Sequence, residues 1–152
     1  MIGQHRIFAD HNQFYVFDAE SDPYDIQDEW SNEIIRKGYL RGKRSIHVVT
    51  VGSYNDHAVS IHLGRPDQDI PEDGHEITTE IIIDSGKIRL SSPAYSIHEQ
   101  LEYSIGFGVF ELTIRSLNSG VEDPDNVEDL EDEEFFKLML LERYELYFAP
   151  KI

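Results

Sequence analysis

Histidine and carboxylate side chains are the residue types in this sequence that could carry acid–base chemistry. His11 could form a His–Asp pair with Asp10 or with Asp18. A single histidine at a break between strands is more often a structural hydrogen-bonding group. The sequence also has no GxSxG elbow, GxxxxGK[ST] loop, HExxH helix or GxGxxG turn. We therefore predict no catalytic residue, and an enzyme that uses His11 is the less favoured alternative.

Metal binding by histidine lacks a complete ligand set. His47 and His62 come to lie opposite each other if residues 45–51 and 57–63 form a hairpin. Two imidazoles leave an ordinary metal site one ligand short. We predict that these are surface histidines, and that the protein uses neither a metal nor a cofactor.

The stretch from Glu122 to Glu134 is acidic and contains no lysine, arginine or histidine. An EF-hand calcium loop beginning at Asp123 fails, because Glu128 stands at the sixth position, where the loop requires glycine. Three interpretations remain: a solvated mobile loop, an irregular ion site, and a recognition surface for a cationic partner. On the last interpretation, the partner-binding residues are Asp123, Asp125, Glu128, Asp129, Glu131 and Asp132.

The composition is that of an acidic protein without cysteine. The 152 residues include 30 acidic and 13 basic side chains, and the formal net charge is −17. Because nucleic acids and anionic lipids carry the same sign of charge, we predict no direct nucleic-acid binding and no membrane binding. The sequence has no signal-peptide pattern and no apolar run that could span a membrane, which predicts a cytoplasmic protein. We expect a single β-rich domain over residues 1–152, with an acidic loop at 119–134.

Aromatic and β-branched residues in short segments indicate a β-rich fold. Strands are expected within 7–17, with a break near 10–12, and over 45–51, 57–63, 75–84, 87–91, 109–117 and 143–149. The loop 52–56 and the pair Ser85–Gly86 have hairpin composition, so each is expected to join two paired strands. Because βαβ alternation is lacking, the fold class is mainly β: an antiparallel β-sandwich or barrel-like domain with one or two short helices.

A helix is predicted from about Asp28 to Gly38, with Trp30, Ile34 and Ile35 on one face and Trp30 as its anchor in the core. Asp25 or Asp28 could cap its start, and Gly38 suits its end. A second short helix is possible within 133–143. The basic residues cluster directly after the first helix, at Arg36, Lys37, Arg41, Lys43 and Arg44. We interpret this cluster mainly as positive charge that complements the helix C-terminus.

The segment "HNQFYVFD" (residues 11–18), followed by Trp30 and a helix that ends in "KGY", resembles the competence protein J family of small bacterial proteins, the inhibitors of a DNA-entry nuclease. The later segments "AVSIHL", "SGKIRL" and "YFAP" follow in a similar order. The resemblance implies a compact β-rich protein without a cofactor, and an inhibitory function. The acidic stretch looks longer here than the family leads us to expect.

Charge and resemblance together predict a non-enzymatic acidic binding protein. It would act as an inhibitor or immunity-type protein that neutralises a basic partner such as a nuclease or toxin, with an aromatic anchor at Tyr144 or Phe135. The alternative is a β-sandwich ligand-binding or homo-oligomeric module whose acidity serves solubility. That alternative predicts a pocket lined by Tyr15, Trp30 or Tyr39, or a homodimer formed through a sheet edge.

Overall fold

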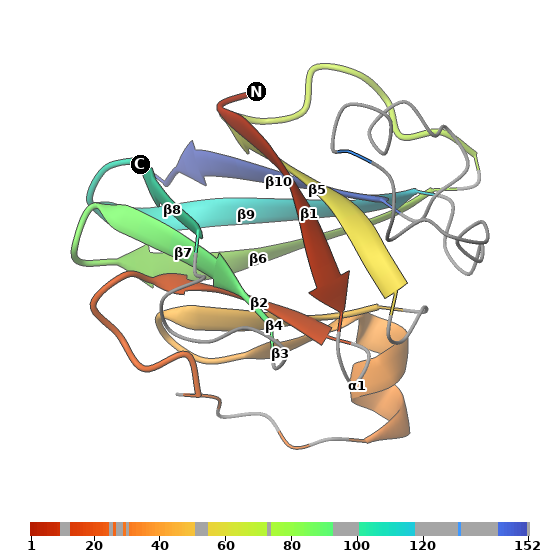
Figure 1. Ribbon diagram of the computed structural model, residues 1–152, viewed down its shortest axis with the longest axis horizontal. Coiled ribbons are helices and arrows are strands. Elements are labelled where there is room, and N and C mark those ends of the chain that lie inside the picture. The colour runs from red at the N-terminus through yellow and green to blue at the C-terminus, as the bar shows by residue number, and fades with distance from the viewer. Residues whose placement is uncertain are drawn as a thin grey trace.

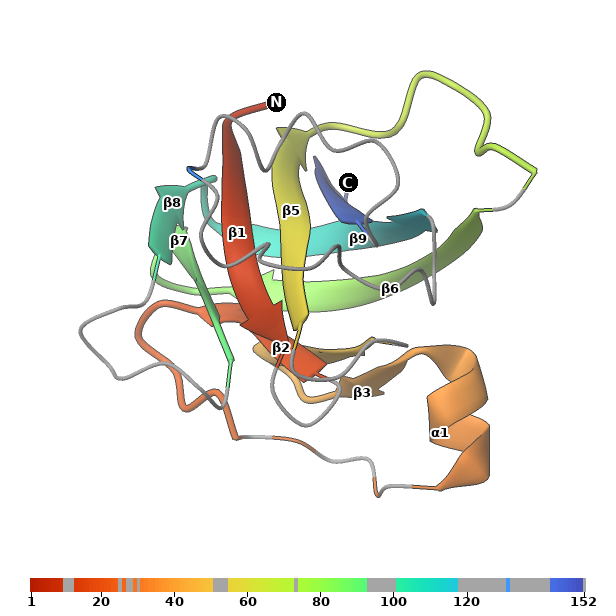
Figure 2. The ribbon, with the colours of Figure 1, turned by 45° about the vertical axis from the view of Figure 1, so that its right-hand side comes forward.

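The computed structural model describes residues 1–9, 13–24, 26, 29, 31–50, 55–72, 74–92, 101–117, 131 and 143–151. Figures 1 and 2 show two twisted sheets packed face to face, with one short helix beside the second sheet. In chain order the elements are β1 (Gly3–Ala9), β2 (Gln13–Asp18), α1 (Asn32–Lys37), β3 (Tyr39–Arg41), β4 (Ser45–Val49), β5 (Asn55–Leu63), β6 (His75–Ile83), β7 (Lys87–Ser91), β8 (Leu101–Ser104), β9 (Gly108–Leu117) and β10 (Arg143–Pro150). Among these residues, no helix has the length and apolar character needed to cross a membrane.

In the described part of the chain, each sheet has five strands. Sheet I has the order β1-β5-β10-β9-β6, and sheet II has the order β3-β4-β2-β7-β8. Neighbouring strands are antiparallel except for β5 and β10, which run parallel. The predicted mainly β sandwich is confirmed, and the two sheets do not close into a barrel.

The core lies between the sheets and is built by alternation along each strand. In β9 the side chains of Phe110, Leu112 and Ile114 are buried on the inner face, as their spacing predicts. The other inner-face residues of sheet I are Ile7, Val59, Ile61, Ile81, Ile83, Tyr144, Leu146 and Phe148. Sheet II contributes Phe14, Val16, Tyr39, Ile46, Val48, Ile88 and Leu90. This aliphatic and aromatic layer holds the two sheets together by burial of apolar surface.

Both predicted hairpins are wrong, although their strands exist. β4 pairs with β2 and β3 in sheet II, whereas β5 pairs with β1 and β10 in sheet I. Likewise β6 pairs with β9, and β7 pairs with β2 and β8. The chain therefore crosses from one sheet to the other at Ser85–Gly86 instead of folding back on its neighbour. His47 and His62 lie in different sheets and do not face each other.

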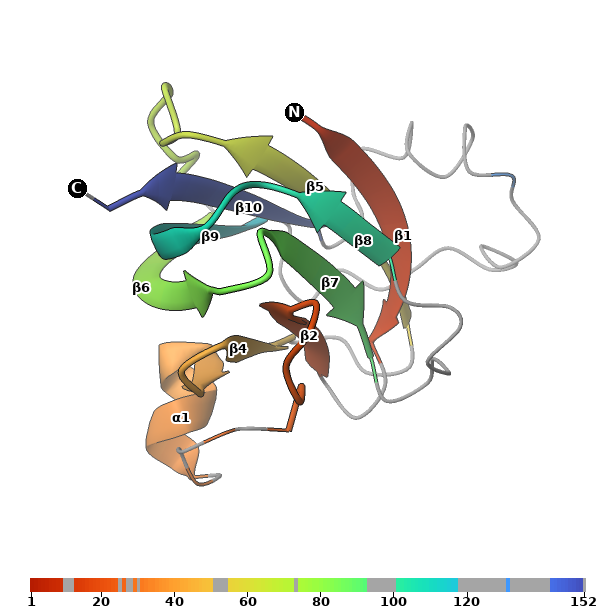
Figure 3. The same ribbon diagram turned by 90° about the vertical axis from the view of Figure 1, so that its left-hand side faces the viewer.

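The two sheets are also linked at their edges. Tyr103 of β8 lies against Gly3 of β1, so close that an added Cβ on Gly3 would collide with its ring. At the other side, the amide of Ile82 in β6 donates to the carbonyl of Lys43 in the β3–β4 turn, at 3.0 Å. Figure 3 shows β8 beside β1 along one edge of the sandwich. These contacts fix the spacing of the sheets at both open edges.

The first helix is shorter than predicted and is capped differently. It begins after Ser31, whose side chain accepts from the amide of Ile34, and not at Asp25 or Asp28. Gly38 ends it in the left-handed conformation (φ 96°), as expected for a C-terminal glycine. None of its six residues is buried, and Ile35 is 55% exposed, so Ile35 does not pack into the core. Trp30 and the possible second helix at 133–143 lie outside the described residues.

Candidate functional site

The predicted partner-binding residues fall almost entirely outside the described part of the chain. Glu131 is described and its side chain is exposed. The other five, Asp123, Asp125, Glu128, Asp129 and Asp132, are outside it, as is Phe135. Tyr144, one of the two predicted aromatic anchors, faces the core and is only 3% exposed. This residue cannot anchor a partner, because the partner could not reach it.

The outer face of sheet I brings charged and aromatic residues together in two rows. The strand register places Glu145 of β10 between Ser60 of β5 and Arg115 of β9, and Arg115 in turn beside Glu76 of β6. The next row contains His62, Tyr147, Thr113 and Thr78 in the same strand order. Alternation explains the arrangement, because residues two apart on a strand share a face.

Arg115 connects these rows to the β5–β6 loop. Its Nε donates to Glu76 Oε2 at 2.6 Å, and its Nη2 donates to the carbonyl of Gln68 at 2.5 Å. The guanidinium also lies over the Tyr147 ring, 5.8 Å from the centroid. With only 7% of its surface exposed, Arg115 acts as an internal tether that fixes one point of the loop to the sheet. Planar guanidinium groups suit this combination of forked donation and stacking.

The β5–β6 loop, residues 64–74, presents an acidic surface that sequence reasoning missed. Asp67, Asp69 and Glu72 are exposed on it. Besides the Arg115 tether, the amide of Gly74 donates to the carbonyl of Pro71 at 2.9 Å. The loop therefore holds three carboxylates on a backbone with fixed points. Figure 2 shows the course of this loop between β5 and β6, at the top of the view. Proline residues and acids within "GRPDQDIPEDG" were the available signal.

An aromatic pair stands beside this loop. The rings of His62 and Tyr147 stack with centroids 4.3 Å apart and an interplanar angle of 16°. Burial lowers the pKa of His62, and the amino terminus lowers it further, while Glu145 acts in the opposite direction. Burial also raises the pKa of Tyr147, and Glu145 and Asp67 add to that rise. Both groups are therefore neutral near pH 7, and they form a flat, half-buried surface next to exposed acids.

The remaining histidine and aspartate candidates have structural roles. His47 Nε2 donates to the carbonyl of Pro23 at 2.6 Å, and burial lowers its pKa. Tyr15 covers the same imidazole, with ring centroids 4.0 Å apart. Asp18, the alternative partner of His11, ends β2 and is 1% exposed, where it accepts hydrogen bonds from Ser85. His11 and Asp10 lie outside the described residues. Within the described residues, no group of three potential metal ligands is present.

In the structure, some residues of the predicted basic cluster lie on α1 and the others lie beyond it. Arg36 and Lys37 occupy the last turn of α1, as expected. Arg41 lies on β3, and Lys43 and Arg44 lie in the turn that follows it, outside the helix. Arg44 forms an ion pair with Asp84. Complementing a helix C-terminus therefore explains only part of this cluster.

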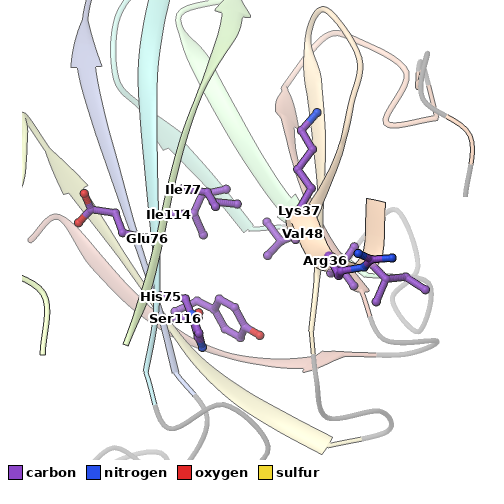
Figure 4. Close-up of a pocket in the computed structure, with 12 residues that line it drawn as sticks. Arg36, Lys37, Val48, His75, Glu76, Ile77, Ile114 and Ser116 are labelled. Atoms are coloured by element: carbon purple, nitrogen blue, oxygen red, sulfur yellow. The ribbon is translucent and has the colours of Figure 1, made fainter. Parts of the chain in front are cut away.

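A cleft opens beside this cluster, between the two sheets, and we call it the inter-sheet cleft. Its volume is about 310 Å³. One side is formed by residues 35–38 and by Val48 and Val49 of β4; the other is formed by His75, Glu76 and Ile77 of β6, Ile114 and Ser116 of β9, and Tyr144 of β10. Figure 4 shows Ile77, Ile114 and Val48 facing the opening, whereas Glu76 points to the other side of β6. A second, open cleft of about 500 Å³ shares Lys37 with it and is also lined by Arg41 and Lys43. Neither cleft is lined by Tyr15 or Tyr39, two of the residues expected to line a pocket.

Comparison with known proteins identifies the fold. Comparison with protein-family models gave no match, and comparison with curated proteins gave none. Among solved structures, the chain is similar to ComJ from Bacillus subtilis, described as an inhibitor of the DNA degrading activity of NucA. The TM-score is 0.72 at 16% identity, and the match covers 98% of this chain and 96% of that chain. It is also similar to a protein described as crocagin biosynthetic gene J, with a TM-score of 0.56, 11% identity and coverage of 98% and 96%. The resemblance to the competence protein J family is thus confirmed as a likeness of fold.

Proposed function

We propose that this protein is a non-enzymatic inhibitor that binds a basic, DNA-degrading nuclease. The observation that carries the proposal is the fold shared with ComJ over 98% of the chain, because ComJ is described as an inhibitor of a DNA-degrading activity. The formal charge of −17 supports it independently. A nuclease must attract DNA phosphates, so its substrate cleft is expected to be positive and to attract an acidic protein.

The binding surface that we propose combines two acidic segments with one aromatic pair. The first segment is the stretch from Glu122 to Glu134, with Asp123, Asp125, Glu128, Asp129, Glu131 and Asp132 as its partner-binding residues. The second is the β5–β6 loop, where the Arg115 tether restrains three exposed carboxylates. Restrained acids lose less entropy on binding than mobile ones. Tyr147, stacked on His62, supplies an aromatic contact beside them, because charge alone gives on-rate more than affinity.

The proposal is tested with a purified nuclease panel that includes NucA. DNA degradation is followed with increasing amounts of this protein at low and at high salt. We expect inhibition of at least one basic nuclease, and an association rate that falls as salt rises. Failure to inhibit or bind any basic nuclease of the panel at low salt would overturn the proposal.

Charge variants then locate the surface. In the loop variant, Asp67→Asn, Asp69→Asn and Glu72→Gln remove three charges, and we expect association to slow about tenfold at low salt. A second variant converts the six acids named in the Glu122–Glu134 stretch to amides. The matched control, Glu20→Gln, Glu29→Gln and Glu33→Gln, also removes three exposed charges, none of which lies on the loop. Equal effects of the loop and control variants would mean that net charge acts, and not this surface.

A further inference from the structure

The inter-sheet cleft has a charge opposite to that of the whole molecule. Arg36, Lys37 and His75 stand on its rim. Within the described part of the chain, neither Arg36 nor Lys37 is in an ion pair, and Lys37 lies over the Tyr39 ring at 4.4 Å. Glu76, the acid of the lining, points away from the cleft and is paired with Arg115. An anion that enters the cleft therefore meets two cations that form no ion pair with a carboxylate of the described residues.

The same cleft has an apolar interior. Ile77, Ile114 and Val48 line it, and Ile35 stands at its opening with 55% of its surface exposed. The register then places His75, Ser116 and Tyr144 side by side on the inner face of β6, β9 and β10, one row beyond Ile77 and Ile114. Polar groups thus border the apolar lining on the side of sheet I, and cations border it on the side of α1. Pockets with an apolar lining and a few convergent polar groups are typical of small-molecule sites.

We propose that the inter-sheet cleft binds a small organic anion with an apolar body, of the class of a medium-chain or aromatic carboxylate. The apolar body lies against Ile77, Ile114 and Val48, and the carboxylate lies at the mouth, where Arg36 and Lys37 make the potential positive. The volume of about 310 Å³ suits a ligand of this size. The second cleft, which continues past Lys37 to Arg41 and Lys43, provides further positive charge along the approach. This inference does not rest on nuclease inhibition.

The test uses the anionic fluorophore 8-anilinonaphthalene-1-sulfonate and its displacement from the full-length protein. Octanoate, 1-octanol and acetate are compared as competitors, because they separate the anionic head from the apolar body. We expect octanoate to displace the probe at least about tenfold more effectively than either of the others. Amide chemical shifts should change at Gly38, Ile77 and Ser116. Displacement by 1-octanol as strong as that by octanoate would overturn the proposal, as would shift changes confined to other parts of the protein.

Two variants probe the mouth without touching the core. Arg36→Gln with Lys37→Gln should weaken octanoate about tenfold, and Ile35→Ser should weaken it by removing exposed apolar surface. The control, Arg65→Gln with Lys87→Gln, removes two positive charges from side chains that are 72% and 52% exposed on other parts of the molecule. The assignment is contradicted if octanoate binds the Arg36/Lys37 variant as tightly as it binds the unmodified protein. It is also contradicted if the control variant loses as much octanoate affinity as the Arg36/Lys37 variant.

Discussion

Asp18 links the two sheets, and its replacement tests how the crossover at Ser85–Gly86 is held. The carboxylate ends β2 of sheet II, is 1% exposed, and accepts from the amide of Ser85 at 3.0 Å and from its hydroxyl at 2.6 Å. Ser21 donates to the other oxygen at 2.9 Å. Burial alone would raise the pKa of Asp18, but these hydrogen bonds outweigh it and hold the pKa below its ordinary value of 3.8.

The cost of removing this carboxylate follows from which donors can find another acceptor. The Ser85 hydroxyl also lies 3.0 Å from the carbonyl of Lys87, and the half-buried Ser21 can reach water, so the Ser85 amide is the donor that is hardest to satisfy. A hydrogen bond to a charged group contributes about 1.5–3 kcal/mol, so we expect Asp18→Asn to lower the free energy of unfolding by about 2 kcal/mol. Asp18→Ala, which removes every acceptor, should cost about 3 kcal/mol.

Urea unfolding between pH 3 and pH 7 checks both the magnitude and its sign. Because the pKa is lower in the folded protein, the charged form stabilises the fold above pH 3.8, and this contribution is lost as pH falls through the folded pKa. The gap between the unmodified protein and Asp18→Asn should therefore be constant near neutral pH and narrow below about pH 4. Asp84→Asn is the matched control, since Asp84 lies on the same connection but is 56% exposed in a surface ion pair. Equal stability of Asp18→Asn and the unmodified protein at pH 7, or a gap that does not narrow in acid, would refute this reasoning.

Two further substitutions test the loop tether and the buried imidazole. Arg115→Gln should lower the free energy of unfolding by about 2 kcal/mol and speed amide hydrogen exchange at Gly74, because the Gln68 carbonyl loses its donor; unchanged exchange at Gly74 would argue against a tether. His47→Gln keeps a donor for the Pro23 carbonyl but does not titrate. Since the pKa of His47 is lowered by burial, the unmodified protein should lose stability relative to this variant as pH falls below 6.5, and parallel unfolding curves from pH 7 to pH 5 would contradict that assignment.

The strands could be predicted because apolar and polar residues alternate along them, and the apolar side chains are the ones that the core buries. "RYELYFA" places Tyr144, Leu146 and Phe148 inside and Tyr147 outside, and the structure agrees. The same alternation shows why Tyr144 was a poor choice of anchor and Tyr147 a better one. Strand partners were not predictable in this way, because a period of two identifies the face of a strand and not its neighbour.

The two wrong hairpins have a common physical cause. A short polar turn can reverse the chain within one sheet, or carry it across to the facing sheet, with the same composition. At Ser85–Gly86 the difference is made by Asp18, which is distant in sequence and binds the turn from sheet II. The parallel pairing of β5 with β10 likewise joins segments far apart in the chain. Such contacts between distant segments cannot be inferred from the local sequence.

The net charge can be counted from the sequence, but the positions of the charged side chains on the surface follow only from the fold. The stretch from Glu122 to Glu134 stood out because nothing basic interrupts it, whereas the acids of the β5–β6 loop are mixed with Arg65 and two prolines. In the structure Arg65 forms an ion pair with Glu111 at 3.0 Å, so its charge is directed to Glu111 and not to the acids of the loop. The basic cluster was interpreted as a helix-end effect, and only the position of β6 reveals that two of its members face an apolar cleft.

The proposed acidic binding surface and the inter-sheet cleft carry opposite charges, so a single variant can show whether they act independently. Arg36→Gln with Lys37→Gln leaves the protein two charges more negative, so attraction of a basic nuclease should stay the same or rise slightly, while octanoate binding falls. If the loop and the inter-sheet cleft instead formed one interface, the same variant would weaken nuclease inhibition as well. The loop ends at Gly74 and the next residue, His75, lines the inter-sheet cleft, so the two surfaces are neighbours in the fold and only a variant can separate them. Measuring inhibition and octanoate affinity on this one variant therefore decides whether the acidic and basic surfaces serve one partner or two.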